Sequence, residues 1–422
     1  MTRSRVSGLL LAGAALVMLA GPASARTPEQ VAEAALKAAP VWDGHNDVAE
    51  QLRDSRKDLI DSFDFADTRG TADPAKDRPA MQTDLNRIRK GHLGAQFWSV
   101  YADYRLPEPQ AVQATLEQID TIKRLIARHP DRMQLATSAA EVEQAMRAGK
   151  VASLIGMEGG GSIGSSLGVL RQMHALGARY LTLVHYKTIG WGDSSNDVPT
   201  NGGLSPFGLQ VVREMQRLGM LVDLSHTSAD VMMDALDEAR APVMFSHSNA
   251  RTVDGHPRNV PDDVLDRLKT NGGIIMVSAV NYFVSEDLRQ WRALRAAEEA
   301  RLNVIHVGYP DRVKPALDMW LTAHPQPLAT LGQLADHIDH IVRRIGVDHV
   351  GVGADLDGGA GLEGFVDVGD YPALFTELAR RGYSQSDLEK IASRNMLRVL
   401  RGAEAYAAAH RGDPPIESPT NF

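Results

Sequence analysis

Short apolar runs of strand length alternate with amphipathic helical patterns along most of the chain. We expect strands at 40–45, 95–102, 151–158, 179–185, 220–226, 241–247, 272–279 and 349–355. Between them, segments such as "LGVLRQMHALG" place apolar residues at helical spacing and end in a glycine, here Gly177. Eight strands separated by helices predict an α/β fold, a (β/α)8 TIM barrel with a parallel sheet.

Two segments are too long for the connections of a minimal barrel. The polar stretch 54–92 follows the first predicted strand, and the Arg/Ala/Glu-rich stretch 284–325 precedes the last. Neither has enough apolar residues for a core of its own. We therefore expect helical or loop insertions on one domain spanning 26–422, with 284–325 forming a lid or a dimer contact.

The N-terminus has the pattern of a secretory signal. Arg3 and Arg5 precede the apolar run Leu9 to Ala20, and small residues follow up to Ala25. The run is shorter than the ~20 residues that span a bilayer. The sequence predicts a signal peptide over 1–25, export to the periplasm or medium, and no stable membrane anchor.

The composition limits the class of protein, the partners and the metal ligands that can be expected. The 422 residues are 43% hydrophobic and 23% charged, which is typical of a soluble globular protein. The net charge is -8, or 43 minus 53 (-10) once Arg3 and Arg5 are removed, which argues against nucleic acid as a partner. Because the chain has no cysteine, disulfides and thiolate metal sites are excluded, and any metal must be held by His, Asp and Glu.

Groups suited to metal binding or acid/base catalysis stand where most of the predicted strands end. They are His45, Asp47, Glu158, His185, His226, His247 and Asp355. The carboxyl ends of the strands in a TIM barrel share one face, where active sites lie, so these groups are expected to converge.

Five of these groups favour a two-metal site. His45 and Asp47, two residues apart, can grip one ion together. Crowded carboxylates need cations, and imidazole with carboxylate suits Zn²⁺. Five ligands exceed the needs of one tetrahedral ion, whereas two ions sharing a carboxylate would use them all. Glu158 is the natural bridge, because its strand lies between those that carry His45 and Asp47 and those that carry His226 and His247.

Each candidate also has a structural interpretation. A lone strand-end histidine such as His185 is more often packed or capped than catalytic, whereas the matched contexts "DLSH" and "MFSH" favour ligands at His226 and His247. Asp355 competes with Asp357, and the glycines that follow make Asp357 a plausible turn residue.

Other histidines are expected to serve structure. His337 and His340 lie three apart in "DHIDH" on an outer helix, where surface packing and hydrogen bonding are favoured over a metal pair. His174 and His349 are expected to be structural, and His256 is left open.

Eight motifs in order resemble one family. They are "DGHND", "AQFWSVYA", "GMEGG", "LTLVH", "DLSH", "FSHSNAR", "ADHIDHI" and "GVGADLDG". The chain resembles the membrane (renal) dipeptidase family of zinc peptidases, in the amidohydrolase-like superfamily, over nearly all of its length after the signal. The superfamily usually opens with His-x-His, so the His-x-Asp of His45 and Asp47 is similar to this branch in particular.

The resemblance implies a dinuclear zinc site that hydrolyses dipeptides, including those with a C-terminal D-residue. One ion would be held by His45 and Asp47 and the other by His226 and His247, with Glu158 and a water or hydroxide bridging them.

It further implies a role for three other residues. His185 would contact the substrate's oxyanion, Asp355 would act as the acid/base, and Arg251 would hold the substrate carboxylate. A homodimer would also match the oligomeric state usual in the family. The alternatives are a related amidohydrolase acting on a non-peptide amide, lactam or lactone, and a non-catalytic binding barrel.

The chain departs from the family near its C-terminus. Where the family often has "GGN", this sequence has Ser393, Arg394 and Asn395, so we expect a changed substrate pocket there. The lipid anchor and disulfide of mammalian members do not carry over, because the chain lacks cysteine and a hydrophobic C-terminal tail.

Overall fold

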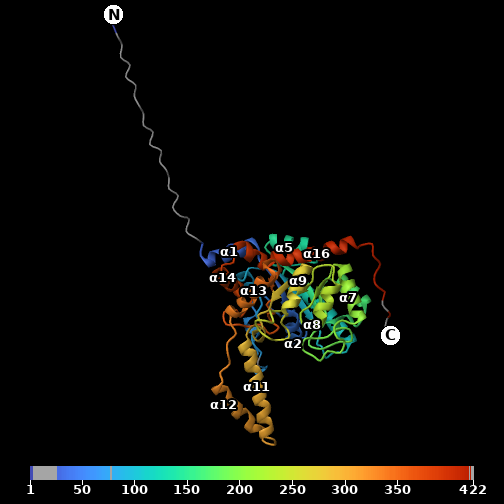
Figure 1. The fold of residues 1–422 in the computed structure, drawn as a ribbon, viewed down its shortest axis with the longest axis vertical. Coiled ribbons are helices and arrows are strands. Elements are labelled where there is room, and N and C mark those ends of the chain that lie inside the picture. The colour runs from blue at the N-terminus through green and yellow to red at the C-terminus, as the bar shows by residue number, and fades with distance from the viewer. Residues whose placement is uncertain (3–25, 77, 418, 420–422) are drawn as a thin grey trace.

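A parallel sheet closed into a barrel forms the centre of the computed structural model, which describes residues 1–2, 26–76, 78–417 and 419 (Figure 1). The strands are β1 Val41–Asn46, β2 Leu93–Tyr101, β3 Met133–Leu135, β4 Val151–Glu158, β5 Ala178–Thr182, β6 Leu221–Asp223, β7 Met244–Phe245, β8 Ile274–Val277 and β9 Val350–Val352. Their order is β2-β1-β9-β8-β7-β6-β5-β4-β3, and a further pairing of β2 with β4 closes the ring. The predicted TIM barrel is confirmed, and β3 is an added edge strand that was not predicted.

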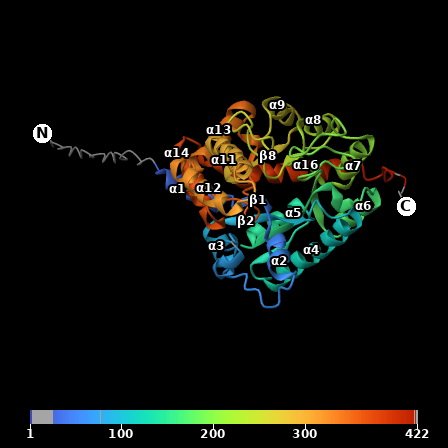
Figure 2. The same ribbon diagram turned by 90° about the horizontal axis from the view of Figure 1, so that it is seen from below.

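Helices surround the barrel (Figure 2). They are α1 Pro28–Ala38, α2 Val48–Arg56, α3 Leu85–Lys90, α4 Glu108–Arg128, α5 Ala139–Arg147, α6 Leu167–Ala175, α7 Pro206–Leu218, α8 Ala229–Glu238, α9 Asp262–Asn271, α10 Asn281–Val284, α11 Glu286–Ile305, α12 Val313–Ala323, α13 Leu331–Ile345, α14 Tyr371–Arg380, α15 Gln385–Glu389 and α16 Asn395–Ala409. Several begin at a side-chain cap, as α7 does at Ser205 and α8 at Ser228.

Aromatic side chains fill the inside of the barrel. Trp42 stacks on Phe97 with ring centroids 5.7 Å apart, and Phe97 contacts Tyr180 at 5.0 Å. All three side chains are fully buried. This packed interior leaves the carboxyl ends of the strands as the open end of the barrel.

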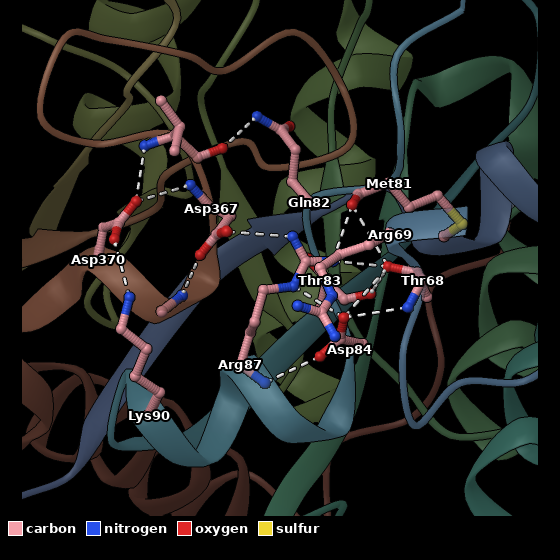
Figure 3. Close-up of polar contacts among 12 residues, drawn as sticks. Thr68, Arg69, Met81, Gln82, Thr83, Asp84, Arg87, Lys90, Asp367 and Asp370 are labelled. Atoms are coloured by element: carbon pink, nitrogen blue, oxygen red, sulfur yellow. Dashed lines mark hydrogen bonds and ion pairs between the residues drawn. The ribbon is translucent and has the colours of Figure 1, made fainter. Parts of the chain in front are cut away.

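The segment 54–92 is pinned to the barrel by polar contacts (Figure 3). Arg87 donates to Asp84 at 2.7 Å, to Asp367 at 3.1 Å and to the Met81 carbonyl at 2.8 Å. The segment 54–92 therefore lies against the loop after β9. Among its described residues, α3 is the only α-helix apart from the end of α2.

The segment 284–325 forms a helical hairpin, α11 and α12, that extends away from the barrel (Figure 1). Within the described residues, no helix has both the length and the apolar character needed to cross a membrane. The predicted signal peptide lies almost wholly outside the described residues and stays a prediction.

The Ser393–Asn395 departure lies at the other end of the barrel. Ser393 and Arg394 belong to a π-helical turn, and the Asn395 amide donates to the carbonyls of Val347 at 2.7 Å and Val350 at 2.9 Å, where β9 begins. The expectation that this departure alters the substrate pocket is wrong, because these residues support the amino end of a strand, opposite the candidate site.

Candidate metal centre

His45 and Asp47 flank the end of the first strand. His45 is in β1, whereas Asp47 follows the strand and occupies the N-cap position of α2 without a side-chain capping bond. Asp47 is thus not a strand residue, but the turn into α2 still brings its Oδ1 to 3.4 Å from His45 Nε2. Both side chains are buried.

Glu158, the last residue of β4, presents its two carboxylate oxygens to different histidines. Oε2 is 3.5 Å from His45 Nε2. Oε1 is 3.0 Å from His226 Nε2, 3.5 Å from His247 Nε2 and 3.6 Å from His185 Nε2. A carboxylate that faces two ligand sets with separate oxygens has the geometry of a bridge between two ions.

The remaining residues follow the ends of their strands. His185, His226 and His247 come after β5, β6 and β7, and Asp355 comes after β9. His226 and Asp355 have φ of 67° and 65°, a conformation that costs free energy in non-glycine residues and is concentrated at functional sites. Seven predicted residues form three overlapping groups: His45, Glu158 and His247; Glu158, His185 and His226; and His45, Asp47 and Asp355.

Hydrogen-bond contacts behind the cluster fix how the imidazoles of His45 and His247 point. Tyr180 OH is 2.8 Å from His45 Nδ1, and Ser246 Oγ is 2.8 Å from His247 Nδ1. Ser246 in turn donates to Asp223 at 2.6 Å. Such contacts orient metal-binding histidines and leave each Nε2 directed at the centre.

The charges of the cluster are strongly coupled. Burial alone raises the pKa of Glu158, but the imidazoles of His45 and His185 hold it well below its usual range. Burial first, then the charges of Asp47 and Glu158, raises the pKa of Asp355 well above its usual range. Burial lowers the pKa of His185 to about 4, so this imidazole is neutral at neutral pH.

The donor set fits a divalent metal. His45 Nε2 and Asp47 Oδ1 are buried and have no hydrogen-bond partner, a costly arrangement unless a cation lies between them. His226 Nε2 and His247 Nε2 are only 2.9 Å apart, as expected for two ligands of one ion. Imidazole and carboxylate donors without thiolates suit zinc.

Asp357 has a different environment from Asp355. Its Oδ1 accepts the Gln82 backbone N–H at 2.7 Å, and its own N–H donates to Gln82 Oε1 at 2.7 Å. Asp355, in contrast, lies with His45 and Asp47. The structure therefore places Asp355 at the centre and Asp357 in the contact that holds the segment 54–92.

The structure does not bring Arg251 to this cluster. Its guanidinium donates to the carbonyls of Asn259 at 2.8 Å and Pro257 at 2.7 Å. Arg258, which was not among the residues predicted from the sequence, is 1% exposed and donates to the His247 carbonyl at 3.3 Å. Its charge helps to lower the pKa of His185, and its Nε is buried without a partner. No pattern marked Arg258, because it lies in a loop without periodicity.

The other histidines serve packing. His337 is fully buried, so the expected surface position is wrong, although the expected hydrogen bonding is present. His340 pairs with Asp262 at 2.8 Å and forms no metal pair with His337. His256, left open above, accepts the Arg258 backbone N–H at 3.1 Å.

Comparison with known proteins identifies relatives over nearly the whole chain. The family model for membrane dipeptidases, peptidase family M19, matches residues 29–413. "Dipeptidase tcpJ" of Claviceps purpurea is 39% identical over 385 residues, covering 89% of this chain and 79% of the relative. "Dipeptidase verJ" of Clonostachys rogersoniana is 37% identical, covering 86% and 84%.

Solved structures share the fold. The probable dipeptidase PvdM from Pseudomonas aeruginosa superposes with a TM-score of 0.76 at 24% identity, covering 90% of this chain and 99% of that one. A metallopeptidase from Rhodobacter sphaeroides, liganded with a phosphinate mimic of the dipeptide L-Ala-D-Ala, gives 0.70 at 23% identity, covering 86% and 99%.

Proposed function

Because the chain belongs to the membrane dipeptidase family of metallopeptidases, M19, we propose that it hydrolyses small dipeptides with two zinc ions. The observation that carries the proposal is the position of Glu158, whose two oxygens face His45 on one side and His226 with His247 on the other. One ion would be held by His45 and Asp47, the second by the two later histidines, and Glu158 would belong to both. Bound zinc supplies Lewis acidity and lowers the pKa of water.

The chain's own residues supply proton transfer and positioning. The position of Asp355, buried beside His45 and Asp47, suits a carboxyl group that takes a proton from the attacking water and passes it to the leaving amine. Neutral His185, 3.6 Å from Glu158, can donate a hydrogen bond to the oxygen on which negative charge develops.

Recognition of the substrate carboxylate is assigned to Arg258 in place of Arg251. Arg258 is buried beside His247, and its charge acts on Asp355 and Glu158. A guanidinium binds both oxygens of a carboxylate, which fits the free C-terminus of a dipeptide. Arg251 is already occupied by two backbone carbonyls.

Substrates with a C-terminal D-residue belong to the same proposal, supported by the Rhodobacter sphaeroides relative that binds a mimic of L-Ala-D-Ala. Export by the N-terminal segment 1–25 is proposed on its charge and apolar pattern.

Turnover of matched L-L and L-D dipeptides by the zinc-loaded mature chain tests the function. We expect hydrolysis of free dipeptides and a large loss of kcat/KM when the C-terminal carboxylate is amidated. Hydrolysis of a non-peptide amide, lactam or lactone with no dipeptide turnover would favour the related amidohydrolase, and inertness toward every substrate after zinc loading would favour the binding barrel.

A further inference from the structure

A pocket at the amino end of the barrel is lined by basic side chains and, among the described residues, by no acidic one. It has a volume of about 250 Å³ and lies between α1, α3, α5 and the first residues of β2 and β4. The whole chain has 53 acidic residues against 45 lysines and arginines, so this local charge opposes the overall charge. We call the site the basic pocket, and its basic side chains are Lys37, Arg89, His92, Arg132 and Lys150.

The order of the sheet brings three of these side chains together. His92, Arg132 and Lys150 each stand one residue before a strand, β2, β3 and β4 respectively. Because β4 pairs with both β2 and β3, the amino ends of the three strands are adjacent. Lys37 and Arg89 are added from the last turns of α1 and α3. The metal centre is at the carboxyl ends of the strands, so the basic pocket is at the opposite end of the barrel, near α1 and α5 and away from α11 and α12 (Figure 1).

Helix dipoles explain only part of this charge. α1, α3 and α5 end beside the pocket, and the C-terminal end of a helix carries partial negative charge that favours cations such as Lys37 and Arg89. His92 and Arg132 belong to no helix. His92 also has φ of 56°, a conformation that costs free energy in a residue other than glycine. The pocket therefore holds more positive charge than the helix ends require.

Carboxylates compensate two of the five basic side chains. Glu33, outside the pocket, lies 2.9 Å from Lys37 Nζ and 3.2 Å from His92 Nε2. The other three have no carboxylate oxygen within 4.0 Å among the described residues, whereas Arg87, on the same helix as Arg89, pairs with two aspartates. Uncompensated cations around one pocket repel each other, and an anion between them would relieve that repulsion.

Arg132 is positioned to bind such an anion. Its Nη2 donates to the Leu85 carbonyl at 2.8 Å, which fixes the guanidinium beside α3, and its other N–H groups have no acceptor within the described part of the chain. Arg132 is half-buried, as are His92 and Lys150. Water screens a half-buried charge less than an exposed one, so its hydrogen bonds to an anion are stronger.

The base of the pocket is apolar and closely packed. Pro40, Ile88 and Met146 line it, and a Cβ atom at Gly94 would fall 2.5 Å from the Pro40 side chain. The volume is below the roughly 300–1,000 Å³ of sites for drug-sized ligands. The pocket therefore suits a small anion with a short organic group.

We propose that the basic pocket binds a phosphate monoester. At neutral pH this group carries a charge of about −1.5 to −2, which matches three uncompensated cations better than a carboxylate does. Arg132 would bind two of its oxygens, and Arg89 and Lys150 would neutralise the remaining charge. The site lies away from the metal centre, so the inference does not rest on the proposed dipeptidase function. The phosphate can belong to a small soluble ester or to a lipid headgroup such as phosphatidic acid, and the open end of the barrel stays accessible in both cases.

Isothermal titration calorimetry with glycerol phosphate tests the proposal. We expect saturable binding of one molecule per chain, with the same affinity in zinc-loaded and zinc-free protein. The Arg89→Gln, Lys150→Gln double variant should bind roughly tenfold or more weakly, because two charged contacts are lost. Its melting temperature should stay close to that of wild type, since neither side chain has an ion-pair partner in the described part of the chain. The matched control is Arg147→Gln, which removes a 70% exposed side chain of α5 from a neighbouring cleft and should bind as wild type does.

Vesicles distinguish the two sources of the phosphate. The protein is sedimented with phosphatidylcholine vesicles that contain phosphatidic acid, or phosphatidylglycerol, whose phosphate is a singly charged diester. Binding to the phosphatidic acid vesicles alone, displaced by glycerol phosphate, would support the proposal and assign the pocket to a lipid headgroup. Binding of glycerol phosphate without binding to vesicles would support it and assign the pocket to a soluble ester. Dipeptide turnover should be the same in all variants.

Three results would overturn the proposal. The first is the absence of saturable binding of glycerol phosphate. The second is binding that the Arg89→Gln, Lys150→Gln variant retains at full affinity. The third is binding that disappears when zinc is removed, which would assign the phosphate to the metal centre.

Discussion

Asp355 and Asp357 are two residues apart, and both are buried with positive φ. Their contacts nevertheless indicate different roles, acid/base catalysis for Asp355 and a structural contact with Gln82 for Asp357. We expect Asp355→Asn to keep its metal and lose roughly 10²- to 10⁴-fold in kcat, the range for general acid/base groups. Asp357→Asn should lower the melting temperature, because it weakens the contact with Gln82, while kcat changes little. Steady-state kinetics with metal analysis checks both, and equal kcat losses would contradict the assignment.

Arg258 and Arg251 offer a second matched pair of residues. Arg258→Met should lower kcat/KM for free dipeptides by at least tenfold and have a smaller effect on amidated ones, because the lost interaction is with the carboxylate. Arg251→Met should have the same effect on both substrates, since its guanidinium serves the loop. A selective loss in the Arg251 variant alone would restore the expectation from the sequence.

At the scale of elements, His337 joins α13 to two neighbouring segments. Its Nδ1 accepts the Ala250 N–H at 3.1 Å, and its Nε2 donates to the Val284 carbonyl at 3.1 Å. The first of these bonds requires the neutral imidazole, because a protonated Nδ1 cannot accept a hydrogen bond. Burial lowers the pKa of His337 to about 4, below the value of about 6.5 in an unfolded chain.

The sign of the pH effect follows from this shift. Between pH 6.5 and 4 the unfolded chain binds a proton that the folded chain does not, so the free energy of unfolding falls as pH falls. We expect wild type to lose about 2 kcal/mol more than His337→Gln between pH 6.5 and pH 5. Urea unfolding at both pH values checks this, and equal losses in the two proteins would contradict it.

The elements also show what the sequence could predict. Every predicted strand is present because apolar runs buried on both faces are a strong signal, although β6, β7 and β9 are only two or three residues long. The short β3 was missed, since "MQL" is too brief to stand out. The predicted strand ends located all seven clustered residues, although only His45 and Glu158 lie within the observed strands and the other five follow them.

Two features could not be predicted, for different physical reasons. Arg258 reaches the cluster through the path of an irregular loop, and no periodicity encodes that path. The segment 284–325 could be recognised as an insertion, but the hairpin is held together by packing of Trp291 against Trp320, which spacing along the chain does not describe.

At the scale of the whole molecule, the barrel brings together groups that lie up to 310 residues apart in sequence, from His45 to Asp355. Aromatic residues inside the barrel contact these groups, as Tyr180 contacts His45. The centre is crowded with carboxylates and imidazoles that are compensated fully only when cations are bound. We therefore expect activity to depend on the number of ions bound to the chain.

Counting zinc per chain while activity is restored tests that number most directly. Metal-free protein is titrated with zinc, and bound zinc and dipeptide turnover are measured on the same samples. We expect two zinc ions per chain at full turnover, and we expect Glu158→Gln to bind the two ions less well. Full turnover with a single zinc ion per chain, or with none, would contradict it.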